Sequence, residues 1–187
     1  MALATEFCSA QSSGEKWYAL YVKARHEKTV AQQLAAKGYK EFLPLYKSRH
    51  CWSDRLREVS LPLFSRYTFC HFEIRNRLQV LRTPGVVRIV GFAGHAASID
   101  DREIQAIQTI VNSGLPANPH PFLKAGQRVR LAAGPLNGLE GIFMAGKGHE
   151  RLIISVNMLQ RSVAVEIDRR WVLPLHTKPL AARLLTV

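Results

Sequence analysis

The nine residues GLPANPHPF, 114–122, divide the chain into two parts with different sequence patterns. This stretch holds three prolines and has the period of neither a helix nor a strand, which is typical of a semi-extended linker. A chain of 187 residues can hold one ordinary domain or two small ones, each with a packed core. We therefore predict two domains joined by a linker over residues 114–123, with a disordered leader over 1–15 and a tail over 177–187.

Before the linker, residues 16–113 alternate between strand-like and helical segments. The run WYALYVKA, from Trp17, predicts a strand, and Val30 and Leu34 then recur at helical spacing, with Gly38 as a natural stop. The order expected over the whole part is β-α-β-β-α-β-α. This order predicts an α+β sandwich of the split βαβ kind, in which helices cover a mainly antiparallel sheet.

The later elements of this part are marked by their own signals. EVSLPLFSRYTFCHF indicates a strand pair, or one strand broken near Ser65, and a short helix is expected around Arg75–Leu81. The last helix should begin after Asp100, a good N-cap with Glu103 three residues on. The apolar face of that helix is predicted to be Ile104, Ile107 and Val111.

After the linker, residues 124–176 change to short β-branched runs separated by Gly-Pro, Asn-Gly and Gly-Lys-Gly turns. Such a pattern over about fifty residues predicts a small β-barrel. Glycine and β-branched residues also oppose a long helical alternative, so we predict that this part is permanently β.

A strong positive charge is the main clue to partners. The formal net charge is +12 with a pI near 10.1, which favours a polyanion, either nucleic acid or an acidic membrane surface. Residues 1–113 and 114–187 each carry an excess of six positive charges, so no isolated basic tail explains the total.

The sequence lacks the motifs that are typical of several classes of protein. The three cysteines are odd in number and widely spaced, which argues against disulfides and a zinc site and favours a reducing cytoplasm. No apolar run has the length of a membrane span. No phosphate-cradling glycine loop, nucleophile elbow or paired histidine ligands occur, so we expect no enzyme activity, no catalytic residue, no metal and no cofactor.

Six segments in the same order resemble one family, the NusG transcription elongation factors, which pair an N-terminal NGN domain with a C-terminal KOW domain. The segments are WYALYVKARHEK, the following FLP, LPLFSRYTF, TPGVVRIVGF with IDDREI, GQRVRLAAGPLNGLEGIF and RLIISVNMLQRSVAVEID. The resemblance implies an NGN domain over 16–113 and an SH3-like KOW barrel over 124–176. The segments FLPLY and MLQRSVAVEI resemble the sequences of the specialised UpxY and RfaH-like antiterminators more closely than that of the general factor.

One position departs from the family pattern. Ser65 and Arg66 stand where the family usually has a Pro-Gly type of turn. A bulky cation at this position departs from the usual turn geometry, although Ser-Arg can occupy a type I turn, which does not need a positive φ.

The resemblance implies that the NGN domain binds the clamp helices of the largest RNA polymerase subunit. Matched position by position, it nominates Phe64 and Tyr67 as contacts, with Leu63 and Phe69 as further members. Aromatic residues on a rigid strand suit a groove for helices. The alternative is that these rings face the domain core. Because alternate side chains point to opposite faces, Tyr67 and Phe69 should share one face of the strand.

Two basic segments are candidates for nucleic acid. Residues 47–58 are expected to form a loop that mixes cations with rings, which suits phosphate contact and base stacking, and the resemblance favours non-template DNA. The alternative is a solvated hairpin tip whose charges pair with Asp54 and Glu58. Arg25 and His26, at the start of the first helix, are a second candidate, against a plain surface pair. The candidates in residues 47–58 are Lys47, Arg49, Trp52, Arg55 and Arg57.

In the KOW part the loop GPLNGLEG carries two leucines where the family presents an apolar residue to Rho or to a small-subunit ribosomal protein. Leu136 is the expected exposed tip, whereas Leu139 is the better candidate for the core.

The function that this resemblance implies is a monomeric, cytoplasmic bacterial factor that rides on RNA polymerase and suppresses pausing or termination. Two alternatives stay open. One is a general factor that recruits Rho for termination, and the other is a KOW-containing RNA-binding or ribosomal protein.

Overall fold

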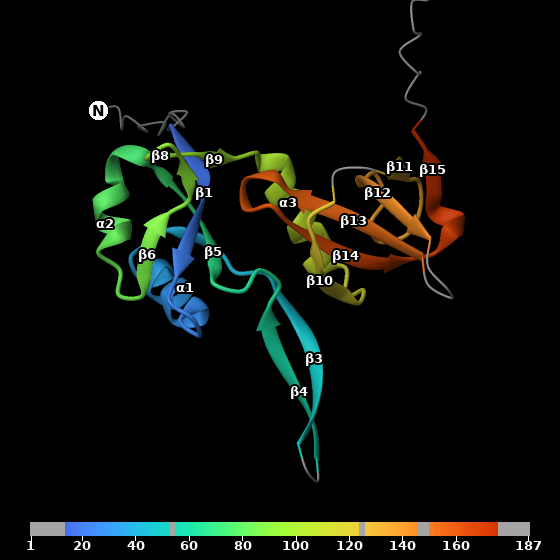
Figure 1. Ribbon diagram of the computed structural model, residues 1–187, viewed down its shortest axis with the longest axis horizontal. Coiled ribbons are helices and arrows are strands. Elements are labelled where there is room, and N and C mark those ends of the chain that lie inside the picture. Colours follow the sequence, from blue (N-terminus) through green and yellow to red (C-terminus); the bar gives the residue numbers. More distant parts are fainter. Residues whose placement is uncertain (1–13, 53–54, 124–125, 146–149, 176–187) are drawn as a thin grey trace, which may run out of the picture. The chain divides into compact units, whose positions relative to one another are not determined.

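The computed structural model describes residues 14–52, 55–123, 126–145 and 150–175, with only the backbone for 49–52, 55–57 and Met158. The described residues form two compact units, one of residues 14–43 with 64–101 and one of 44–63 with 102–175. The predicted mixture of helices and strands is confirmed, and strands are in the majority (Figure 1). The division into domains at residues 114–123 stays a prediction.

The first unit is built on an antiparallel sheet in the order β2-β5-β1-β6, with β9 also paired to β1 (Figure 1). The central pair, β1 and β5, runs in register from Glu15↔Glu73 to Tyr21↔Tyr67. The predicted break near Ser65 is present, because no strand covers residues 63–66. The elements are β1 (Glu15–Val22), α1 (Glu27–Ala36), β2 (Lys40–Phe42), β5 (Tyr67–Glu73), a 3-10 turn (Ile74–Asn76), α2 (Arg77–Leu81), β6 (Val86–Ile89), β7 (Gly91–Phe92), β8 (His95–Ala96) and β9 (Ser98–Ile99).

Helix α1 forms where the spacing of apolar residues predicts it. Val30 and Leu34 are fully buried on its inner side, as expected. The chain leaves the helix at Gly38, whose φ of +84° is the left-handed conformation that glycine adopts without a steric penalty. The helix therefore ends at Ala36, two residues before the glycine that the sequence indicates as its stop.

The pleat of β1 and β5 gives the sheet two different faces. On the helix side, Tyr18, Leu20, Cys70 and Phe72 pack with Val30, Leu34 and Val80 of α1 and α2. The other face, which we call the aromatic face, carries Trp17, Tyr21, Tyr67 and Phe69, together with Phe42 of β2 and Phe64. The prediction that Tyr67 and Phe69 share a face is confirmed.

Cys70 should be unreactive in the folded protein. It is fully buried on the helix side, and burial, with the nearby Glu41 carboxyl, raises the pKa of its thiol to about 12. In a Cys8→Ser/Cys51→Ser background, we expect iodoacetamide to leave Cys70 unmodified at pH 8 and to label it after denaturation in urea. An unfolded cysteine loses its proton at about pH 8.5. The contribution of the Cys70 thiol to the free energy of unfolding is therefore complete below that pH and falls as the pH rises toward 12. Rapid native labelling would contradict this account.

The second unit contains a six-stranded antiparallel sheet in the order β10-β14-β13-β12-β11-β15 (Figure 1). Its buried side chains are mainly β-branched or leucine, which explains why the strands follow the predicted β pattern. The strands are β10 (Ala117–Pro121), β11 (Gln127–Leu131), β12 (Glu140–Ala145), β13 (Glu150–Val156), β14 (Arg161–Ile167) and β15 (Val172–Pro174), with 3-10 turns at Asn157–Leu159 and Arg169–Trp171.

The prediction that residues 114–122 lack strand structure is wrong. Residues Ala117–Pro121 form β10, which pairs with β14 through Pro119↔Val163 and Pro121↔Arg161. Proline is tolerated here because β10 is an edge strand. Two prolines two residues apart place their missing N–H groups on the same outer side of that edge.

The prediction of a loop over residues 47–58 is also wrong. β3 (Leu45–Trp52) and β4 (Arg55–Pro62) form a separate two-stranded ladder from Leu45↔Pro62 to Trp52↔Arg55 (Figure 1). Its polar composition hides the strands, because periodicity detects only strands that bury one face.

The helix α3 (Asp101–Asn112) confirms the predicted last helix of the first part. Ile104 and Ile107 are buried as expected, but the third fully buried residue is Ile110, and Val111 is only half-buried. No helix in the described ranges is both long and apolar enough to cross a membrane.

Candidate docking surface

The aromatic face is made of an inner group and an outer pair. In the inner group, the ring of Phe69 stacks on Phe42 with centroids 6.0 Å apart and meets Phe64 edge-on at 5.6 Å. The outer pair, Tyr21 and Tyr67, lies edge to face at 5.5 Å. These are the geometries that aromatic rings prefer, so each group holds its members in fixed orientations.

The four residues nominated for polymerase contact differ in exposure. Leu63, Phe64 and Phe69 are 3%, 2% and 0% exposed, whereas Tyr67 is half-buried. In this structure Tyr67 is therefore the nominated residue that offers atoms to a partner, whereas the other three are buried. Their role in binding stays a prediction.

Arg66 adopts a conformation that the sequence argument did not expect. Its φ is +68°, so Ser65 and Arg66 do not form the type I turn that this pair can occupy without a positive φ. The strain is held by two hydrogen bonds: the Arg66 N–H donates to Glu27 Oε1 at 2.8 Å, and the Arg66 carbonyl accepts from Val22 N–H at 2.9 Å. Glu27 is buried at the start of α1, which makes the contact a fixed part of the fold.

Two guanidinium groups lie over the ring of Tyr21. The Cζ of Arg66 is 4.6 Å from the ring centroid and the Cζ of Arg88 is 5.2 Å from it. Both distances are within the range of cation–π attraction. Sequence reasoning did not find Tyr21 or Arg88, although the alternation along β1 places Tyr21 on the same face as Trp17.

The loop between β1 and α1 adds further cations at this end of the sheet. The Lys23 N–H donates to the carbonyl of Gly85 at 2.9 Å, which joins the loop to the start of β6. Arg25, with a φ of +65°, and His26 are exposed, and the His26 ring nitrogen Nδ1 lies 3.0 Å from the Ala24 carbonyl. We call Lys23, Arg25, Arg66 and Arg88 the cationic end of the aromatic face.

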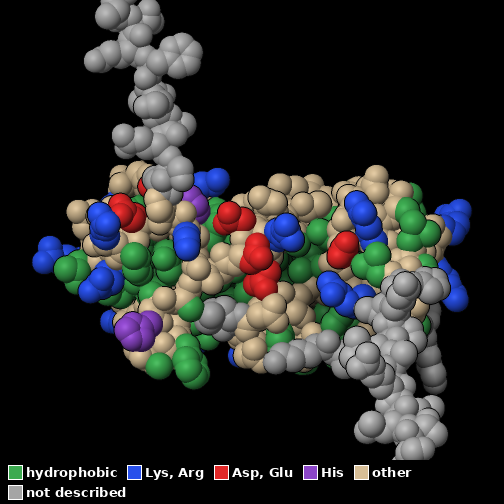
Figure 2. Space-filling view, turned by 90° about the horizontal axis from the view of Figure 1, so that it is seen from above, with side chains coloured by type: hydrophobic (Ala, Val, Ile, Leu, Met, Phe, Trp, Pro, Cys, Tyr) green, Lys and Arg blue, Asp and Glu red, His purple; other side chains and the backbone are tan. Residues whose placement is uncertain are grey.

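The predicted nucleic-acid residues of the hairpin are only partly described. Lys47 is exposed and forms an ion pair of 3.2 Å with Glu58, as the solvated-hairpin alternative proposes for that pair. The side chains of Arg49, Trp52, Arg55 and Arg57 lie outside the described residues, although their backbones belong to the ladder. Figure 2 shows basic side chains in several separate groups on the face it draws, which agrees with a charge excess spread along the chain.

Leu136 is fully buried, so the expectation that it forms an exposed loop tip is wrong. The loop folds back on itself: the Gly138 N–H donates to the Leu131 carbonyl at 2.8 Å, and the Asn137 N–H donates to the Gly134 carbonyl at 3.2 Å. These turns direct Leu136 inward and leave Leu139 half-buried.

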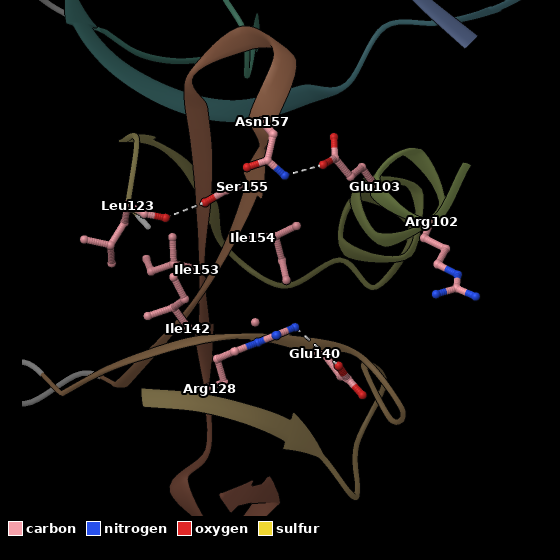
Figure 3. Close-up of a pocket in the computed structure, with 11 residues that line it drawn as sticks. Arg102, Glu103, Leu123, Arg128, Glu140, Ile142, Ile153, Ile154, Ser155 and Asn157 are labelled. Atoms are coloured by element: carbon pink, nitrogen blue, oxygen red, sulfur yellow. Dashed lines mark hydrogen bonds and ion pairs between the residues drawn. The ribbon is translucent and has the colours of Figure 1, made fainter. Parts of the chain in front are cut away.

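The second unit contains a pocket of about 410 Å³ (Figure 3). Its polar side chains are paired with neighbours: Asn157 donates to Glu103 at 2.6 Å, Ser155 to the Leu123 carbonyl at 2.9 Å, and Arg128 lies 3.8 Å from Glu140. The pocket therefore does not present a converging set of free polar groups to a ligand. Within the described ranges, no three His, Cys, Asp or Glu side chains are grouped closely enough to hold a metal.

A family model described as transcription termination factor nusG matches residues 15–108, just over half of the chain. The chain therefore belongs to the NusG family of transcription factors, a class without enzymatic activity. The matched range contains the aromatic face and its cationic end.

One of the similar solved structures shares the fold. A Thermotoga maritima NusG chain, from a structure described as showing its domain interaction, has a TM-score of 0.54 at 18% identity and covers 87% of this chain and 98% of its own. Two chains from crystal structures of an MjSpt4:Spt5 complex have TM-scores of 0.29 and 0.30 at 15% and 16% identity, with 85% of this chain covered and 96% and 97% of their own. At TM-scores this low, the similarity to these two chains carries no structural inference.

Proposed function

We propose that this protein is a specialised antitermination factor that binds the clamp helices of the largest RNA polymerase subunit through its aromatic face and suppresses pausing or termination. The observation that carries the proposal is the partial exposure of Tyr67 on the aromatic face. Tyr67 is half-buried at the end of β5, and its ring is held against Tyr21 on a face already lined with aromatic residues.

The physical properties of this face suit a helical partner. Tyr67 lies on a strand whose neighbours β1 and β2 are both hydrogen-bonded to it, so the ring is presented by a rigid support. A tyrosine gives a large contact area with few rotatable bonds, which keeps the entropy cost of binding small. Two residues along the same face, the buried ring of Phe69 packs against Phe42 and Phe64.

Within the same proposal, the hairpin of β3 and β4 is the contact for non-template DNA, and the second unit binds a small-subunit ribosomal protein. Recruitment of Rho by the second unit belongs to the general-factor alternative. The hairpin forms a two-stranded sheet of its own, and four of its residues are cations in the sequence, Lys47, Arg49, Arg55 and Arg57.

The test is binding of the full-length protein to a clamp-helix fragment of the host polymerase. Tyr67→Ala should weaken binding of the fragment about thirtyfold or more, because removal of a central aromatic anchor costs about 2 kcal/mol or more. Tyr39→Ala is the matched control: Tyr39 is also half-buried, but it packs against Phe72 on the helix side. Its binding should stay within twofold of wild type.

Equal losses in the two variants, with both proteins folded by circular dichroism, would reject the aromatic face as the docking surface. A read-through assay with purified polymerase then separates the two functional alternatives. Increased read-through supports antitermination, whereas increased termination only when Rho is added supports the general-factor alternative.

A further inference from the structure

The cationic end of the aromatic face is a built feature. Tyr67, Tyr21 and Arg88 are cross-strand neighbours on β5, β1 and β6, so they form one row across the sheet. Arg66 lies over the middle of that row, at 4.6 Å from the Tyr21 ring. Both Arg25 and Arg66 have left-handed backbones, a conformation that costs non-glycine residues free energy and that collects at functional positions.

The charges at this end are not neutralised within the fold. In the part of the chain that the structure describes, no carboxylate lies within ion-pair distance of Lys23, Arg25, Arg66 or Arg88. Glu27 is buried, and one of its oxygens already accepts the Arg66 N–H. Since both guanidiniums lie over one ring, they are within about 10 Å of each other, the screening length at 0.1 M salt, so they repel one another and jointly attract an anion.

The geometry favours a carboxylate of a protein over a nucleic acid. A guanidinium stacked on a ring keeps its outer N–H groups free for a bidentate carboxylate. Stacking also covers the ring of Tyr21, which is then not available to stack on a base. The half-exposed Tyr67 at the other end of the row suits an apolar side chain.

We infer that the partner helix places an acidic side chain between Arg66 and Arg88 while an apolar side chain of the same helix packs on Tyr67. Tyr67 and Arg88 are two strands apart, roughly 10 Å, which matches the rise of about 10.5 Å between positions i and i+7 of a helix. The partner is therefore a helix with an apolar residue at i and Asp or Glu at i+7. The inference rests on the proposed docking function and specifies its partner.

The experiment uses the full-length protein and the clamp-helix fragment at several salt concentrations. Arg66→Asn/Arg88→Gln removes both charges, and asparagine tolerates the left-handed backbone of position 66. We expect binding to weaken about tenfold or more and to depend less on salt. The control, Arg77→Gln/Arg82→Gln, removes two exposed charges from the helix side and should change binding less than twofold.

Acidic residues of the fragment are then neutralised one at a time. Neutralisation of one acidic residue, which lies seven residues from an apolar position, should weaken binding of the fragment to the wild-type protein about tenfold. The same change should have no further effect on binding to the Arg66→Asn/Arg88→Gln protein, because the two changes remove the same contact.

The outcomes separate the inference from the proposed function. If wild type does not bind the fragment, both fail. If Tyr67→Ala loses binding but the arginine variant matches its control, the docking function stands and the acidic contact is rejected. If the arginine variant keeps fragment binding and loses binding to a single-stranded oligonucleotide, the cationic end is a nucleic-acid contact and the inference is overturned.

Discussion

Replacement of Phe69 by alanine should lower the free energy of unfolding by about 3–5 kcal/mol, the range for loss of a buried phenylalanine. Phe69 is fully buried in the central strand β5, and its ring meets both Phe42 and Phe64. Alanine would leave a cavity at a point where strands on both sides limit how far the neighbours can collapse. Urea denaturation followed by far-UV circular dichroism measures the change.

Phe92→Ala is the matched control for this experiment. Phe92 is 82% exposed in β7, so the same substitution removes the same atoms without a cavity and should change stability by less than about 0.5 kcal/mol. A loss of less than about 1 kcal/mol for Phe69→Ala would show that the ring is not part of a packed core.

The size of this effect decides how binding data on Phe69 should be interpreted. A variant that loses several kcal/mol is partly unfolded, and it fails to bind whether or not the ring touches a partner. Tyr67→Ala does not have this problem to the same degree, because Tyr67 is half-buried and sits at the end of its strand. The docking surface should therefore be tested at Tyr67 before its buried neighbours.

The elements that bury one face could be predicted from the sequence. The strand from Trp17, the helix with Val30 and Leu34, and the helix with Ile104 and Ile107 all have an apolar period that matches their structure. The strands of the β3–β4 hairpin do not have such a period, because polar and charged residues interrupt the apolar positions of both strands. β10 was missed for a different reason: its prolines indicate a linker unless the strand is known to lie at an edge.

The candidate site could be predicted only in part. Family resemblance led to Tyr67, and strand alternation placed it on one face with Phe69. Arg88 could not be added, because the pairing of β1 with β6, including a register shift at Tyr21 and Val22, depends on contacts far apart in the sequence. The positive φ of Arg66 is likewise a tertiary effect, since it is held by the buried carboxylate of Glu27.

Gly134→Ala should destabilise the second unit by about 2–5 kcal/mol, from a left-handed backbone penalty of about 1–2 kcal/mol and a packing penalty of about 1–3 kcal/mol. Gly134 has a φ of +78°, and a Cβ there would lie 2.8 Å from two ring carbons of Trp171. The backbone of Trp171 is held in place, because its carbonyl accepts the Ala132 N–H at 2.8 Å and its backbone N–H donates to the Asp168 carbonyl at 3.0 Å.

Gly138→Ala separates the two contributions in the same loop. Its φ of +85° is close to that of Gly134, but no atom lies within 4 Å of the position where its Cβ would be. This variant should therefore show only the backbone penalty of about 1–2 kcal/mol. Urea denaturation followed by tryptophan fluorescence compares the two proteins. Equal losses of stability in the two variants would mean that position 134 is not in close contact with Trp171. A larger loss for Gly134→Ala would show that close contact with this ring leaves no room for a side chain at position 134.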